Sequence, residues 1–236
     1  DDSDIDIVLV PGLGAHPEKS WESENDKNRF NWATDKDGGI IKDFPKARIL
    51  LYMYESAWAG DYKVKQLMDN IAHFLVQGLN TLRKNCKKRP IVFIGHSMGG
   101  LVIAKAVALA DTYREKYPFM FEAISAAIFF GTPFKGADIA SAAVMFSRLA
   151  EKTGFGAVAS KLLEDLTPGN SYLKSIREEF ATLITKLTHK IYVLCFYEER
   201  PTNFAEMAHL PGIANLAKHC HAQGIQRLCY RRVSDA

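Results

Sequence analysis

The segment Gly95-His96-Ser97-Met98-Gly99 and its two flanks constrain the fold more than any other part of the sequence. Residues 91–94 are all apolar, as is typical of a buried parallel strand, and residues 100–110 predict a helix that is apolar on nearly every face. A strand that turns directly into a helix strains the backbone between them and needs small residues two positions before and two after. The pattern therefore predicts a strand–turn–helix unit that presents the Ser97 hydroxyl at the carboxyl end of a sheet.

This unit is the GxSxG pattern of a nucleophile elbow, in which the helix N-terminus behind the serine favours negative charge. The alternative is a chance GxSxG match in the strand-to-helix turn of another doubly wound protein. The agreement of the strand, the glycines and the helix favours the elbow.

Strand and helix patterns alternate along the chain, which predicts an α/β fold with a mostly parallel, doubly wound sheet and helices on both faces. Apolar runs predict strands at residues 5–10, 47–54, 91–94, 123–130 and 191–197, and a weak edge strand at 226–233. Asp61 is expected to cap a helix with apolar residues at helical spacing, which are Val64, Leu67, Met68, Ile71, Phe74, Leu75, Leu79 and Leu82.

The 236 residues and the 47% hydrophobic content are sufficient for one domain, 1–236, with a sizeable core. We expect that core at residues 5–135 and 188–203. The mostly helical pattern between two strands predicts a lid at about 136–187. Residues 204–236 form an atypical C-terminal segment.

The net charge of +3 gives no indication of nucleic acid or of an anionic membrane as a partner, and the cluster Lys84, Lys87, Lys88 and Arg89 is interpreted as a solvated loop. Four cysteines without a CxxC pair or metal-ligand spacing predict neither a metal nor a cofactor, and they fit a reducing compartment. No apolar stretch approaches the roughly 20 residues that cross a bilayer. A cytoplasmic location is expected, with peripheral membrane association as the alternative. Because the chain begins Asp1-Asp2-Ser3-Asp4, it is expected to be a segment of a longer parent protein with further domains.

An acyl-transfer site needs a nucleophile, a base, a group that orients the base and two donors for the oxyanion. Ser97 is the expected nucleophile, and the backbone N–H of Met98 is one expected oxyanion donor. The second donor is expected from the Gly12-Leu13-Gly14 loop, with the N–H of Leu13 as the candidate. The alternative for this loop is an ordinary glycine turn after a strand.

The acid is expected after the strand that follows the lid, because these hydrolases place nucleophile, acid and histidine in that chain order. Glu198 is the first candidate, since it comes directly off that strand, and Glu199 is the second. Asp138 and Asp165 are weaker alternatives. The two glutamates could also be solvated surface charges.

The histidine is expected to be His219 or His221, which lie near the C-terminus where the chain order places the base. His209 lies too close to the acid strand unless the chain doubles back. For each of the three, a surface histidine is the alternative interpretation. His96 is adjacent in sequence to Ser97 and is expected to point elsewhere, toward packing or a substrate contact.

Four segments together resemble the lipase-like serine esterase group that includes the GPI inositol-deacylase-type hydrolases. They are VLVPGLG at 8–14 with Trp21 following, IGHSMGGL at 94–101, FFGTP at 129–133 and FYE at 196–198. Their order is more narrowly similar to the hydrolase domain at the N-terminus of fungal proteins with NACHT, ankyrin or tetratricopeptide regions. The resemblance covers about residues 5–203. It implies an α/β-hydrolase fold, nucleophile Ser97, carboxylate Glu198, and hydrolysis of an ester or lipid ester without a metal.

The chain departs from this family in three places. Pro11 stands where the family usually has His, and Phe134-Lys135 stands where it commonly has His-Arg. Nothing after Thr202 resembles the segment that carries the family's catalytic histidine. Two hypotheses follow: a serine esterase or lipase-like hydrolase, or a catalytically impaired signalling or binding module of a larger NACHT or repeat protein.

Overall fold

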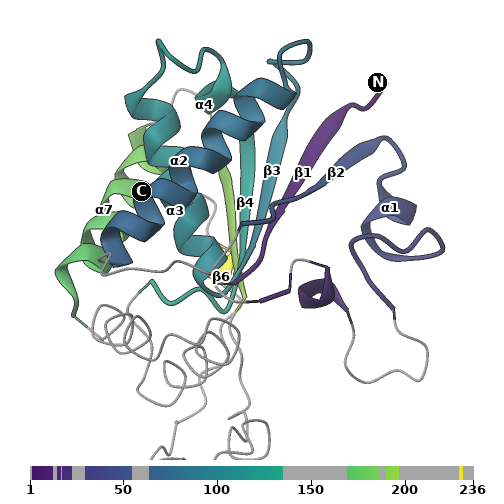
Figure 1. The fold of residues 1–236 in the computed structure, drawn as a ribbon, viewed down its shortest axis with the longest axis horizontal. Helices are drawn as coiled ribbons and strands as arrows, with labels where there is room; N and C mark the ends of the chain where they lie inside the picture. The colour runs from purple at the N-terminus through teal and green to yellow at the C-terminus, as the bar shows by residue number, and fades with distance from the viewer. Residues whose placement is uncertain are drawn as a thin grey trace, which may run out of the picture.

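A six-stranded sheet organises the part of the chain that the computed structural model describes, which is residues 2–12, 15–16, 18–22, 30–54, 64–134, 169–186, 190–196 and 229–230 (Figure 1). The sheet order is β2-β1-β3-β4-β5-β6. Its strands are β1 (Ile5–Val10), β2 (Ala47–Leu51), β3 (Ile91–His96), β4 (Ile124–Phe130), β5 (Tyr192–Phe196) and β6 (Cys229–Tyr230). The first five pair in parallel, and β6 pairs antiparallel with β5, so the predicted mostly parallel sheet is confirmed.

Several strand boundaries differ from those expected: β3 continues to His96, and β5 begins at Tyr192. The strand predicted at residues 47–54 ends at Leu51, although the Tyr52 N–H still donates to the Leu9 carbonyl at 2.9 Å. Backbone pairing goes no further because Pro11, which follows the neighbouring strand β1, has no N–H to donate to β2. The strand predicted from residue 123 begins at Ile124, because Ala123 closes the short helix α4 (Met120–Ala123).

Three helices cover one face of the sheet: α2 (Val64–Leu82), α3 (Met98–Thr112) and α7 (Ser171–Lys186) (Figure 1). Val8 and Val10 of β1 point to this face and share its core. The prediction that α3 is apolar on nearly every face is confirmed, since eleven of its residues are buried. This burial leaves the elbow helix almost no polar surface of its own.

The apolar stripe predicted for α2 is wrong at two positions. Phe74 is 55% exposed and Leu82 is 53% exposed. Phe74 lies two residues from the buried Ala72 and Val76, on the opposite side of the helix from them, and Leu82 is the last residue of the helix, so neither is buried.

The opposite face is covered by the segment between β1 and β2, which contains the 3-10 helix η1 (Lys19–Trp21) and helix α1 (Gly39–Asp43). Trp21 and Ile40 pack there against Ile7 and Leu9 of β1. Successive β1 residues therefore enter two different cores, which explains why the strand is apolar almost throughout.

Helix α7 corrects the predicted lid. Residues 171–186 were expected in the lid, but Leu173, Ile176 and Phe180 are buried in the same core as α3. Lys105 of α3 lies between α2 and α7, with its Nζ 3.7 Å from Asp69 Oδ1 and 3.5 Å from Glu179 Oε2. The physical reason is topological: β4 and β5 are parallel, and parallel neighbours need a crossover helix that packs on the sheet. The rest of the predicted lid, residues 136–168, lies outside the described residues.

At the amino end of the sheet, three arginines surround the fully buried carboxylate of Asp6 on β1. Arg48 donates from Nε to Oδ1 at 2.8 Å and from Nη2 to Oδ2 at 3.0 Å, and the buried Arg83 donates to Oδ2. Arg89 donates to Oδ1 at 3.3 Å. The hydrogen bond to Asp6 raises the pKa of Arg48, whereas burial lowers the pKa of Arg83.

The Asp6 cluster ties β1 to β2, to the end of α2 and to the start of β3. It also corrects the interpretation of the basic cluster as solvated at one position: the Arg89 side chain is only 9% exposed, whereas Lys84, Lys87 and Lys88 are exposed as predicted. Arg83 also donates to the carbonyl of Lys87 at 3.1 Å and to that of Arg89. The loop backbone is therefore held by the same buried guanidinium that holds Asp6.

Replacing Asp6 by Asn is expected to lower the free energy of unfolding by about 3 to 5 kcal/mol, because the charge of Arg83 then stays buried without its counter-ion. Urea unfolding followed by circular dichroism measures this. Asp4→Asn is the matched control: it removes an exposed carboxylate 3.7 Å from Lys46 Nζ and should cost less than about 1 kcal/mol. Equal losses in the two variants would contradict the assignment.

Candidate active site

Ser97 occupies the single residue between β3 and α3, and its backbone is strained. Its φ of 54° and ψ of −127° lie in a region that residues with a side chain rarely adopt. Two hydrogen bonds hold this conformation: the Ser97 N–H donates to the Phe130 carbonyl at 2.8 Å, and the Gly100 N–H donates to the Ser97 carbonyl at 3.1 Å. Strain of this kind costs about 1 to 3 kcal/mol and persists only where the surroundings impose it.

The glycines on either side of Ser97 are required by close approach. A Cβ atom at Gly95 would lie 2.8 Å from the Gly100 Cα, and one at Gly99 would overlap the carbonyl oxygens of Val10 and Pro11. The elbow therefore packs on itself through Gly95 and on the end of β1 through Gly99.

Gly99→Ala is expected to lower the free energy of unfolding by about 1 to 3 kcal/mol or more, because the first turn of α3 must move away from the end of β1. Urea unfolding measures the loss. Gly78→Ala in the middle of α2 is the control, since no atom lies within 4 Å of a Cβ there, and it should raise stability by about 0.5 to 1 kcal/mol. A Gly99→Ala protein as stable as the wild type would refute the close packing.

The two expected sources of oxyanion donors both lie at Ser97. Met98 is the first residue of α3, where a backbone N–H has no acceptor within the helix. Gly12 follows β1, and a Cβ there would lie 3.2 Å from the Ser97 Cβ and 3.5 Å from its Oγ. Leu13 and Gly14 lie outside the described residues. The structure thus brings Ser97, Met98 and the start of the predicted oxyanion loop together.

Two tyrosines after β2 hold backbone carbonyls with their hydroxyls, one in the loop beside Ser97 and one in α2. The sequence did not single them out. The Tyr54 hydroxyl donates to the Pro11 carbonyl at 2.8 Å, and the Tyr52 hydroxyl donates to the Ile71 carbonyl at 2.8 Å. Burial raises the pKa of Tyr52 to about 12 and also raises the pKa of Tyr54. Both phenols therefore stay protonated donors at neutral pH.

The carboxyl ends of β3, β4 and β5 lie side by side at the edge of the sheet that carries Ser97. His96 pairs in register with Phe130, and Phe130 pairs with Phe196. The Gly131 N–H donates to the Phe196 carbonyl at 2.9 Å, and the rings of Phe130 and Phe196 stack with centroids 4.8 Å apart. The chain thus leaves β5 at the same edge of the sheet as the elbow.

The remaining predicted site residues lie outside the described part of the chain. They are the acid candidates Glu198, Glu199, Asp138 and Asp165 and the histidine candidates His209, His219 and His221. Within the described residues, no group of three or more His, Cys, Asp or Glu side chains could hold a metal ion, and no helix is long and apolar enough to cross a membrane.

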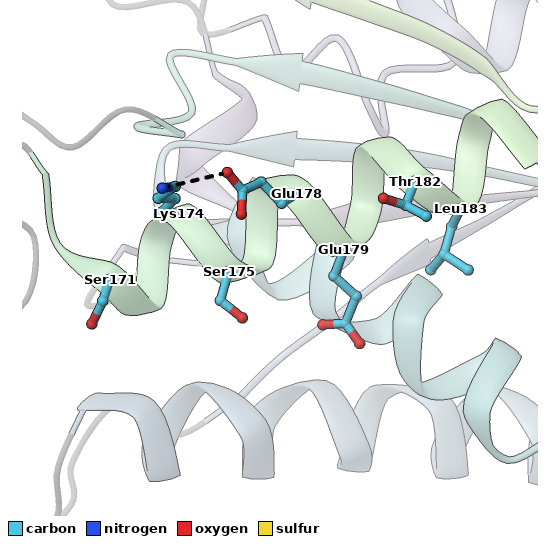
Figure 2. Close-up of a pocket in the computed structure, with 7 residues that line it drawn as sticks. All are labelled: Ser171, Lys174, Ser175, Glu178, Glu179, Thr182 and Leu183. Carbon is cyan, nitrogen blue, oxygen red and sulfur yellow. Dashed lines mark ion pairs between the residues drawn. The ribbon is translucent and has the colours of Figure 1, made fainter.

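A groove of about 510 Å³ runs along α7 and is separate from the elbow (Figure 2). Its described lining comes from this helix alone, from Ser171, Lys174, Ser175, Glu178, Glu179, Thr182 and Leu183. Lys174 Nζ lies 3.9 Å from Glu178 Oε1, an exposed ion pair within one turn of the helix. Because the groove is open and its described lining comes from one helix, it is not the enclosed cavity in which an ester would be buried.

Comparison with known proteins gives a family match and several distant relatives. The profile of the family described as Putative serine esterase (DUF676) matches residues 7–185. Protein SERAC1 of Homo sapiens is 25% identical over 219 residues, which are 87% of this chain and 32% of the human protein. The Mus musculus protein is 24% identical over the same lengths. The chain therefore spans about a third of the length of these curated relatives.

Two solved structures share the fold. The Bacillus licheniformis lipase BlEst2 aligns with a TM-score of 0.50 at 19% identity, over 87% of this chain and 70% of the lipase. Phospholipase PlaB from Legionella pneumophila aligns with a TM-score of 0.54 at 13% identity, over 90% of this chain and 42% of PlaB. At these identities the comparisons show the α/β-hydrolase fold, which the resemblance of the four sequence segments implies.

Proposed function

Because the chain belongs to the Putative serine esterase (DUF676) family, we propose that it hydrolyses carboxylic esters with Ser97 as the nucleophile. The observation that carries the proposal is the strained Ser97 between β3 and α3, with Gly12 packed against its side chain. A serine held in this way has its hydroxyl free of the helix and next to the start of α3, and we propose that the Met98 and Leu13 N–H groups are the two backbone donors that acyl transfer requires.

In the proposed reaction the Ser97 Oγ attacks the ester carbonyl carbon while a histidine takes the hydroxyl proton. The resulting oxyanion accepts hydrogen bonds from the N–H groups of Met98 and Leu13. Collapse of the tetrahedral intermediate breaks the bond to the alcohol, which leaves with the proton from the histidine. Water then attacks the acyl-serine by the same steps, which releases the acid and restores Ser97.

Glu198 is the proposed acid. It lies two residues after Phe196, whose carbonyl and ring are fixed beside the end of β4. An acidic residue that follows β5 directly therefore starts from the edge of the sheet that carries Ser97. Glu199 is the second candidate for the same reason, and His219 or His221 is the proposed base.

A lipid ester is the proposed substrate class, supported by two fold relatives that are named a lipase and a phospholipase. The narrower likeness to GPI inositol-deacylase-type hydrolases and to fungal NACHT-associated domains stays a prediction. The relatives described above, from mammals and bacteria, add no support to it. A cytoplasmic location, or peripheral membrane association as its alternative, also stays a prediction.

A catalytically impaired binding module of a larger protein is the second candidate. The observation that favours it is the sequence after Thr202, which has no likeness to the family's histidine segment. The family match also ends at residue 185, before every histidine proposed as the base. A chain without a working base keeps only the residual rate that binding and the oxyanion donors supply, about 10³-fold over water.

A fluorophosphonate probe is expected to label the wild-type protein at Ser97, because an activated serine displaces its fluoride. Mass spectrometry of the labelled peptide locates the site. Ser97→Ala should abolish labelling, whereas Ser175→Ala, which changes an exposed serine on α7, should leave it intact. A folded wild-type protein that takes up no probe would overturn the proposed hydrolase and support the binding module.

Either His219→Ala or His221→Ala is expected to lower kcat/KM for a p-nitrophenyl ester by about 10³-fold or more, since a triad without its base retains only residual catalysis. Glu198→Gln should also lower kcat/KM. His209→Ala is the control and should keep wild-type turnover. Equal activity in all three histidine variants would refute the assignment of the base.

A further inference from the structure

We infer that Tyr54 is a positioning residue for the oxyanion loop: its hydroxyl holds the Pro11 carbonyl and thereby fixes the Pro11–Gly12 backbone against Ser97. The inference rests on the proposed function, and it assigns a role to a side chain 43 residues away in sequence from the backbone that it holds.

The ends of β1 and β2 are joined first by backbone pairing and then by a side chain. Backbone pairing runs from Ile5–Ala47 to Leu9–Leu51 and closes with the Tyr52 N–H on the Leu9 carbonyl. Pro11 has no N–H, so the backbone ladder cannot continue to the loop. Two residues further along, the Tyr54 hydroxyl donates to the Pro11 carbonyl at 2.8 Å. The side chain thus supplies the hydrogen bond that the backbone cannot make.

The Pro11 carbonyl is packed against the elbow. Its oxygen lies against Gly99 in the first turn of α3. The next residue, Gly12, lies against the Ser97 Cβ and Oγ. The Tyr54 hydroxyl, the Pro11 carbonyl and the start of α3 therefore form one contact chain that ends at the nucleophile.

The peptide unit between Pro11 and Gly12 links the fixed carbonyl to the residue beside Ser97. A trans peptide is planar, so a fixed Pro11 carbonyl also fixes the Gly12 N–H and the Gly12 Cα. Beyond that plane the glycine backbone is free to turn, and the Ala15 N–H holds the Gly12 carbonyl at 3.1 Å. Oxyanion donors accelerate acyl transfer only when they are aimed before the charge develops. Loss of the Tyr54 hydrogen bond should therefore affect the chemical step more than substrate binding.

Tyr52 provides a matched control for Tyr54. Its hydroxyl donates to a backbone carbonyl at the same distance of 2.8 Å, but this carbonyl belongs to Ile71 in α2. The two rings lie 5.4 Å apart, and burial raises the pKa of both phenols. Removing the Tyr52 hydroxyl leaves the Ile71 carbonyl with its partner inside helix α2, whereas removing the Tyr54 hydroxyl takes from the Pro11 carbonyl the donor that holds the loop.

The test compares Tyr54→Phe with Tyr52→Phe in turnover of a short-chain p-nitrophenyl ester and in urea unfolding. Tyr54→Phe should lower the urea midpoint at least as much as Tyr52→Phe, because only the Ile71 carbonyl keeps a partner within a helix. Tyr54→Phe should lower kcat by about 10- to 100-fold, a part of the loss seen when an oxyanion donor is removed outright, with KM within about twofold. Tyr52→Phe should keep kcat within about twofold of the wild type.

A double-mutant cycle with Gly12→Ala tests whether Tyr54 acts through the loop. The added Cβ presses on Ser97, so Gly12→Ala should lower kcat by itself, and the double variant should lose less than the product of the two single losses. Independent losses would overturn the inference, and so would equal kcat values in Tyr54→Phe and Tyr52→Phe. Ser97-dependent turnover that Tyr54→Phe leaves unchanged overturns the inference alone. Absence of Ser97-dependent turnover in the wild type overturns the proposed function and the inference with it.

Discussion

The turn from β3 into α3 within one residue is the constraint on which the site depends. It holds Ser97 at a positive φ, and it leaves room for no side chain at Gly95 or Gly99. Because Gly99 contacts the carbonyls of Val10 and Pro11, the helix cannot take this path unless the end of β1 lies beside it. The same packing brings Gly12 against Ser97. The elbow and the loop that would complete the oxyanion hole are therefore consequences of one close approach.

The same central strands are fixed at both ends of the sheet by different chemistry. At the amino end, Asp6 and its three arginines hold β1, β2 and β3 in register through buried charge. At the carboxyl end, neutral hydrogen bonds take over, from Tyr54 to Pro11 and from Ser97 to Phe130. The buried charges of the Asp6 cluster therefore lie at the opposite end of the strands from Ser97.

The sequence predicts what local periodicity determines and misses what distant contacts determine. The elbow, the parallel strands and the apolar α3 follow from short patterns, and the structure confirms them. A lid helix and a crossover helix share one amphipathic pattern, so α7 is separated from the lid only by its packing on α3. Arg89 looks like part of a solvated cluster until Asp6, 83 residues away in sequence, is placed beside it. Tyr54 is likewise an ordinary strand aromatic until the fold brings Pro11 to its hydroxyl.

The strain at Ser97 bears on the choice between a hydrolase and a binding module. A residue with a side chain at a φ of 54° costs about 1 to 3 kcal/mol, whereas glycine adopts such a conformation readily. A module that used the fold only for binding would gain stability from glycine at this position and, within the described part of the chain, would lose no hydrogen bond of the hydroxyl. The chain instead keeps a serine there, half-buried and with Gly12 against its Oγ. The strain is accounted for when the hydroxyl itself reacts, which favours catalysis over binding as the function of this fold.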